Sequence, residues 1–143
     1  MKAFILGAVL LIQGVIDLKY KEIPFWVSAV GAVLGIGISI LEKREVVGLL
    51  LAVLPGVLAL LFARASREAL GYGDGVLFVV MGIYLSLGHV LEIAMMAFGI
   101  AGICALILIV VFRKKRDDQI PFVPFLTVSY ILWLFINEGG YVW

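Results

Sequence analysis

Residues 46–63 read VVGLLLAVLPGVLALLFA, a run of eighteen residues without a charged side chain. A helix needs about 20 apolar residues to cross the hydrocarbon of a bilayer, because each residue adds about 1.5 Å. Other apolar segments lie on both sides of this one, and the charged residues gather in the short connections between them. The predicted membrane spans are residues 3–16, 25–41, 46–63, 75–87, 93–112 and 120–136.

The composition of the whole chain supports the same fold class. Of the 143 residues, 64% are hydrophobic and only 15% are charged, whereas an ordinary soluble domain is about 45–50% apolar. A soluble core of this size could not bury so many apolar side chains. We therefore predict an all-α integral membrane protein in which residues 1–143 form one domain, a single bundle of six transmembrane helices. The net charge of +1 argues against a nucleic-acid partner.

The distribution of lysine and arginine predicts how the chain is oriented, since cytoplasmic loops carry the excess of these residues. With the amino terminus outside, eight of them fall on the cytoplasmic side and three on the other side. The eight are Lys19, Lys21, Arg64, Arg67, Arg113, Lys114, Lys115 and Arg116. The three are Lys2, Lys43 and Arg44. Both termini are thus predicted to be extracytoplasmic in a plasma (inner) membrane, with the loops at 18–24, 64–74 and 113–119 inside.

This topology places two aspartates on the cytoplasmic side, Asp17 after the first span and Asp74 before the fourth. Both spans are short for a full crossing, so both carboxylates are expected below the membrane surface. Ionisable groups at that depth are costly and usually serve a function. Two neighbouring carboxylates cannot both ionise easily, so one can take a proton from water while the other polarises a carbonyl group.

Simpler interpretations exist for each residue of this candidate site. Asp17 could be an interfacial charge beside Lys19, and Asp74 could cap the helix that follows it. Gly71 and Gly73 could let a substrate backbone approach Asp74, or could serve only the geometry of a turn. The single histidine, His89, is predicted in a solvated loop on the outer side, where it cannot join the aspartates.

Three short segments resemble motifs of the type IV prepilin peptidase family. Gly71-Tyr72-Gly73-Asp74 is similar to the GxGD motif of intramembrane aspartic proteases. Asp17-Leu18 followed by Ile23-Pro24 is similar to the family's first-aspartate segment. The third resemblance is to a late IPFxPFL segment, here Ile120-Pro121-Phe122 with Pro124-Phe125-Leu126.

The resemblance implies an aspartic endopeptidase with Asp17 and Asp74 as the catalytic pair and Gly71 and Gly73 as supporting residues of the active-site loop. It implies no metal and no organic cofactor. The implied substrates are prepilin-like precursors of type IV pilus or protein secretion systems, with a basic leader before a hydrophobic helix, cleaved at the cytoplasmic face. A preflagellin-type peptidase, a proton-coupled transporter or an inactive assembly component are the alternatives.

The sequence departs from the common family pattern in three places. Larger members carry two CxxC pairs and an N-methyltransferase activity, whereas Cys104 is the only cysteine here. Phe25 stands where an asparagine often follows Ile-Pro, and Val76 stands where a lysine often follows GxGD. We expect the last two departures to affect substrate handling more than the catalytic pair.

The predicted orientation can be tested by labelling cysteines in intact cells. In a chain whose Cys104 is replaced by serine, Lys115→Cys should resist membrane-impermeant thiol reagents until the cells are opened, because the loop at 113–119 is predicted to be cytoplasmic. Labelling of this cysteine from outside intact cells would reverse the orientation.

Overall fold

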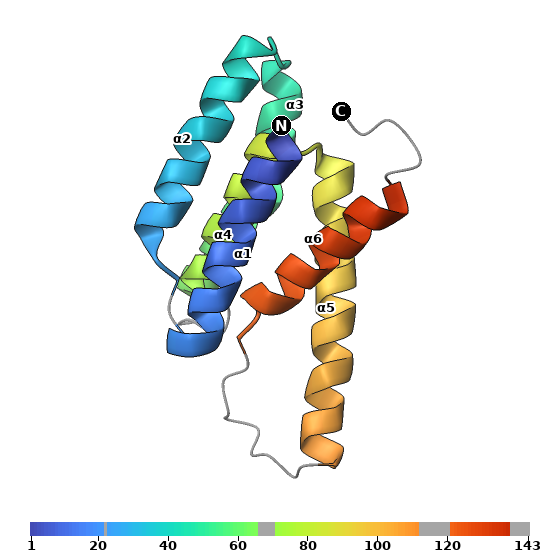
Figure 1. Ribbon diagram of the computed structural model, residues 1–143. Helices are drawn as coiled ribbons and strands as arrows, with labels where there is room; N and C mark the ends of the chain where they lie inside the picture. Colours follow the sequence, from blue (N-terminus) through green and yellow to red (C-terminus); the bar gives the residue numbers. More distant parts are fainter. Residues whose placement is uncertain (22, 66–70, 112–120, 138–143) are drawn as a thin grey trace.

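The computed structural model describes residues 1–21, 23–65, 71–111 and 121–137, and they form a bundle of six α-helices (Figure 1). The helices are α1 (Lys2–Tyr20), α2 (Phe25–Leu41), α3 (Val46–Ala65), α4 (Tyr72–Tyr84), α5 (Leu87–Val110) and α6 (Val123–Asn137). By length and composition α1, α3 and α5 can each cross a membrane, and the other three are shorter apolar helices. The predicted all-helical membrane bundle is therefore confirmed.

The helix ends differ from the predicted spans in places that matter for the site. Helix α1 continues past the predicted end at Ile16 to Tyr20, so that Asp17 lies inside the helix. Helix α5 begins at Leu87, before the predicted start. The prediction that His89 lies in a solvated loop is wrong, because it belongs to the first turn of α5. Residues 66–70 of the predicted loop at 64–74, and the whole predicted loop at 113–119, lie outside the described residues. They hold five of the eight counted basic residues.

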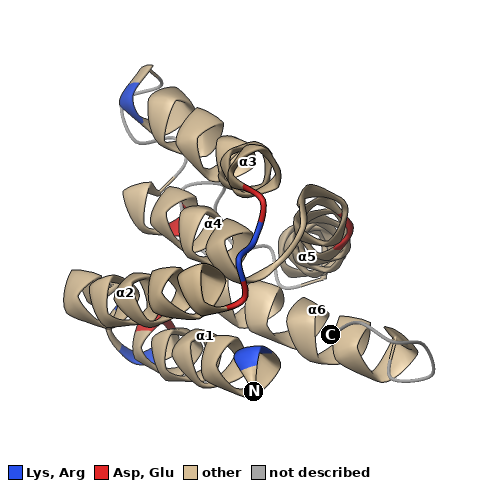
Figure 2. Ribbon diagram, turned by 90° about the horizontal axis from the view of Figure 1, so that it is seen from above, with Lys and Arg blue, Asp and Glu red and all other residues tan. Residues whose placement is uncertain are grey.

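Helix α4 occupies the centre of the bundle and packs against α1, α2, α3 and α5. Its 13 residues give a length of only about 20 Å, and most of its side chains are buried. The helices around it present large apolar side chains outward, for example Leu50, Val33 and Met95, which are 66%, 70% and 75% exposed. Such a surface is suited to lipid rather than to water. Charged residues lie mainly at helix ends and in the connection between α2 and α3 (Figure 2).

Helices α3 and α4 approach one another closely through two glycines. A Cβ atom on Gly56 would overlap the backbone nitrogen of Val79, and one on Gly82 would overlap the carbonyl oxygen of Ala52. Small residues of this kind let membrane helices pack backbone against backbone. The position of α4 in the bundle is therefore set largely by α3.

Adding a methyl group at this contact should destabilise the bundle. We expect Gly56→Ala to lower the free energy of unfolding by about 1–3 kcal/mol, because the colliding atoms are backbone and cannot turn aside. Gly48→Ala is the matched control on the same helix, since a Cβ there meets nothing within 4 Å and alanine favours the helix by roughly 0.5–1 kcal/mol. Thermal unfolding in detergent distinguishes the two; equal effects would contradict the close contact.

Candidate active site

The structure brings Asp17 and Asp74 to the same end of the bundle. Asp17 lies in the last turn of α1 and Asp74 in the first turn of α4, and these helices pack against one another (Figure 1). Asp17 is 6% exposed and Asp74 is half-buried. This is a pair of carboxyl groups at the edge of an apolar interior.

Neither simpler interpretation of the aspartates fits their surroundings. Asp17 is buried, unlike an interfacial charge, whereas its neighbour Lys19 is exposed. The N-cap of α4 is Gly71, so Asp74 is already inside the first helical turn. The positive pole of α4 favours a carboxylate at that position.

Asp17 is anchored by the start of α6. Its Oδ2 accepts a hydrogen bond from the backbone N–H of Val123, at 3.2 Å. The first N–H groups of a helix have no partners within the helix, so they are available to an acceptor of this kind. The Thr127 hydroxyl lies 2.9 Å from the carbonyl oxygens of both Leu10 and Val123, so its single proton can be shared between them. The Val123 N–H thus ties the described part of the late motif, residues 121–126, to the first aspartate, and Thr127 ties α6 to α1 nearby.

The two glycines of the GxGD-like motif provide space rather than an unusual backbone conformation. No glycine among the described residues has a positive φ, and Gly71 has an extended backbone. A Cβ on Gly73 would overlap the side chain of Ile23, while one on Gly71 would lie 3.2 Å from Asp74 Oδ2. Gly73 therefore allows the Ile23-Pro24 segment to lie against the start of α4.

Phe25 and Val76, the two substitutions within the family's motifs, follow Ile23 and Gly73 closely in the sequence, and these are the two residues that form this contact. Phe25 begins α2 and is 63% exposed. Val76 lies in α4, half-buried, in the helical turn that holds Asp74. Neither side chain adds a charge or a hydrogen-bonding group to the end of the bundle that holds the aspartates.

A buried polar pair below the aspartates was not identified from the sequence. Gln13 is fully buried and Ser28 is 2% exposed; Gln13 Nε2 donates to Ser28 Oγ at 2.7 Å. Gln13 Oε1 has no partner among the described residues. A polar contact between membrane helices contributes about 0.6 kcal/mol, whereas an unsatisfied buried polar group costs about 1–3 kcal/mol. If Gln13 served only to link the two helices, the cost of its unsatisfied oxygen would exceed the free energy gained from its hydrogen bond to Ser28.

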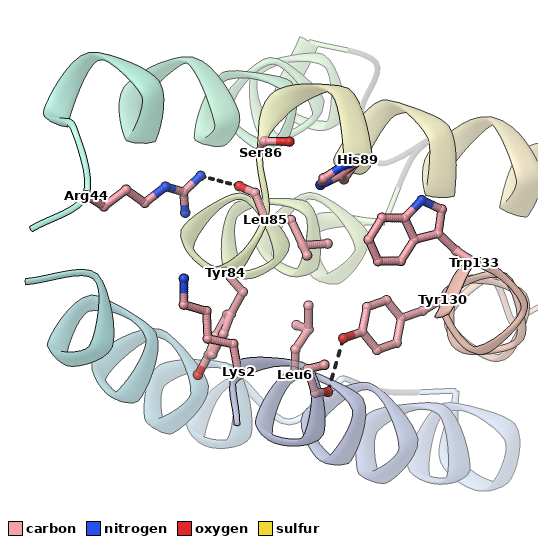
Figure 3. A pocket seen from close by; sticks show the side chains of 10 residues that line it. Lys2, Leu6, Arg44, Tyr84, Leu85, Ser86, His89, Tyr130 and Trp133 are labelled. Carbon is pink, nitrogen blue, oxygen red and sulfur yellow. Dashed lines mark hydrogen bonds between the residues drawn. The ribbon is translucent and has the colours of Figure 1, made fainter. Parts of the chain in front are cut away.

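A cavity of about 250 Å³ lies at the other end of the bundle, away from the aspartates. Figure 3 shows aromatic side chains along it, with His89 and Trp133 in ring contact at 4.8 Å. Glu92 stabilises this wall by accepting a hydrogen bond from Trp133 Nε1 at 2.8 Å. The cavity lacks the carboxylates of the candidate site, so we do not assign the peptidase chemistry to it.

The cationic groups of this cavity are already engaged. Lys2 forms an ion pair with Glu42. Arg44 donates to the carbonyl oxygens at the end of α4, those of Gly82, Ile83 and Leu85. Burial lowers the pKa of the Arg44 guanidinium and the charge of Glu42 opposes this shift, but an arginine side chain remains charged. Arg44 therefore serves as a cap for α4.

Among the described residues no group of three or more His, Cys, Asp or Glu side chains could hold a metal ion. The described polar groups toward the aspartate end include the two carboxyl groups, the backbone N–H of Val123 and, one helical turn along α1 from Asp17, the Gln13 amide.

Comparison with known proteins identifies the family of this chain. The family model described as the type IV leader peptidase family matches residues 4–110, which include Asp17, Gly71, Gly73 and Asp74. The late segment at 120–126 lies beyond the matched residues. Comparisons with curated proteins and with solved structures find no match. Since the family model covers well over half of the chain, this protein belongs to the type IV leader peptidase family, and membership implies a peptidase of the aspartic type.

Proposed function

We propose that this chain is a membrane aspartic endopeptidase that removes leader peptides from type IV prepilin-like precursors, with Asp17 and Asp74 as its catalytic pair. The observation that supports the proposal is that Asp17 and Asp74 lie at neighbouring ends of α1 and α4, two helices that pack against one another. Family membership supplies the class of substrate. Residues 1–143 act in this proposal as one membrane-embedded peptidase domain.

The chemistry requires one ionised and one neutral carboxyl group. The ionised carboxylate takes a proton from water as the water oxygen bonds to the scissile carbonyl carbon, while the neutral carboxyl group gives its proton to the carbonyl oxygen. The C–N bond then breaks as the first carboxyl group passes its proton to the leaving nitrogen. The tetrahedral intermediate's hydroxyl returns a proton to the second carboxylate, so that the pair ends as it began.

The surroundings of the pair are compatible with a peptide approaching from the end of the bundle. Gly71 and Tyr72 are exposed at the start of α4, next to the half-buried Asp74. Asp17 is more deeply placed and held by α6. A chain entering over the first turn of α4 would meet Asp74 and Asp17 without the bundle having to open between its transmembrane helices.

The orientation of the site is also part of the proposal. Lys19 and Lys21 are exposed beside Asp17, and basic residues favour the cytoplasmic side. The site would then face the cytoplasm, where a basic leader precedes the precursor's hydrophobic helix, and both termini would be extracytoplasmic.

Asp17→Asn and Asp74→Asn should each abolish cleavage of a leader-bearing pilin while leaving the protein inserted. Asparagine has nearly the same size but cannot carry a proton between water and peptide, so either change removes a chemical step. Co-expression with a precursor reports cleavage as a shift in its size.

Glu45→Gln is the matched control, because it neutralises an exposed carboxylate outside the site. It should cleave like the wild type. If either asparagine variant, expressed at the normal level, retained a substantial part of wild-type cleavage, the mechanism with two aspartates would have to be abandoned.

The purified chain should cleave without methylating the new amino terminus, because the resemblance links methyl transfer to CxxC pairs and this chain has one cysteine. Mass spectrometry of the product, with a methyl donor present, checks this. A product heavier by one methyl group, with no other enzyme added, would contradict it.

A further inference from the structure

The Gln13–Ser28 pair lies one helical turn below the aspartates. Gln13 precedes Asp17 by four residues on α1, so both project from the buried face of that helix. The contacts of Gly31 show which residues of α1 and α2 face one another: a Cβ on Gly31 would lie 3.1 Å from Val9 on α1 and 3.6 Å from Val80 on α4. One helical turn from this contact toward the aspartates, Gln13 on α1 faces Ser28 on α2. One turn further still, Asp17 lies at the level of the segment at 23–24, which lies against Gly73.

The Gln13 amide has hydrogen-bonding capacity that the described residues do not use. Its Nε2 carries two protons, and one hydrogen bond from it, to Ser28, is present. Its Oε1 has no partner among the described residues. If the amide were turned over, Nε2 would take the place of Oε1, so one polar end remains free in either assignment. A fully buried amide in this state requires a further polar partner.

We propose that Gln13, held by Ser28, binds a water molecule between itself and Asp17. One helical turn is about 5.4 Å, which a single water spans with two hydrogen bonds of about 2.8 Å each. The Asp17 side chain leans toward the preceding turn, as helical side chains do, and its Oδ2 is held by Val123. The amide, the Ser28 hydroxyl and the carboxyl group give the water the two to four polar partners that buried waters have.

This water gives Gln13 a positioning role in the reaction, an inference that rests on the proposed function. A hydrolase needs water at the scissile bond, and the apolar interior below the aspartates supplies no other described polar group at this level of α1 and α2. The bound water donates a hydrogen bond toward the Asp17 carboxyl group and so helps to hold it in place. The carboxyl pair thereby keeps the geometry in which it meets the attacking water.

The water site can be tested without any peptidase assay. Glutamine occurs only twice, at Gln13 and Gln119, so a chain labelled with ¹⁵N-glutamine gives two side-chain amide signals, and Gln13→Met identifies the first by deleting it. We expect the Gln13 amide to show a direct dipolar cross-peak to water in detergent micelles although the residue is fully buried. A folded chain whose Gln13 amide shows no such cross-peak would overturn the water site.

The role in catalysis is tested by comparing Gln13→Met with Ser28→Ala. Both variants lose the hydrogen bond from Gln13 to Ser28 that joins α1 to α2, but only Gln13→Met also loses the Gln13 amide that would bind the water. We expect Gln13→Met to lower kcat roughly 10- to 100-fold with KM nearly unchanged, and Ser28→Ala to lower kcat by less than about threefold. Gln13→Met should unfold at a temperature no lower than Ser28→Ala.

Equal losses of kcat in the two variants would mean that the pair only links the helices, and would overturn the positioning role. A wild-type chain that cleaves no leader-bearing precursor would instead refute the proposed function and, with it, the role in catalysis. The cross-peak at Gln13 would still decide whether the water site exists.

Discussion

Hydrocarbon offers no hydrogen bonds, so a polar group buried in this bundle is stabilised only where it finds a partner inside the bundle. Among the described residues Gln13 Oε1 and Ser129 Oγ have no partner, whereas several other buried side chains donate to backbone carbonyl groups of neighbouring helices. Tyr84 on α4 donates to Gly31 on α2 at 2.6 Å, Tyr130 on α6 donates to Ala3 on α1 at 3.1 Å, and Ser39 on α2 donates to Ile83 on α4 at 3.1 Å. The same rule that fixes the bundle also fixes Asp17, whose partner is a backbone N–H.

The two aspartates are held in different ways. Asp74 is carried on α4, whose place is set by glycine contacts with α3 and by Arg44 at its far end. Asp17 is carried on α1 and is held from the side by α6. One carboxyl group thus belongs to the helix at the centre of the bundle, while the other depends on a backbone N–H of α6.

Much of this arrangement could be predicted from the sequence, because hydropathy and charge report where a chain meets lipid or water. The apolar segments and their order, and α2 at Phe25–Leu41, were predicted in this way. Where prediction failed, the reason was a contact between distant residues. The polarity of His89 and Glu92 suggests a loop, but in the structure both lie in α5 and contact Trp133 of α6. The bond from Val123 to Asp17 and the spare amide of Gln13 have no local signature either, because each depends on how helices are placed against one another.

The bond between Asp17 and Val123 joins residues that are 106 positions apart, and this separation has a consequence for synthesis of the protein. A chain emerges from the ribosome amino terminus first, and early parts fold before later ones. Helices α1 to α5 can therefore assemble while the first aspartate still lacks its partner. The Asp17 carboxylate gains its hydrogen bond from Val123 only when α6 has been made, so a ribosome-bound fragment that stops short of Val123 would contain the first aspartate without the group that orients it.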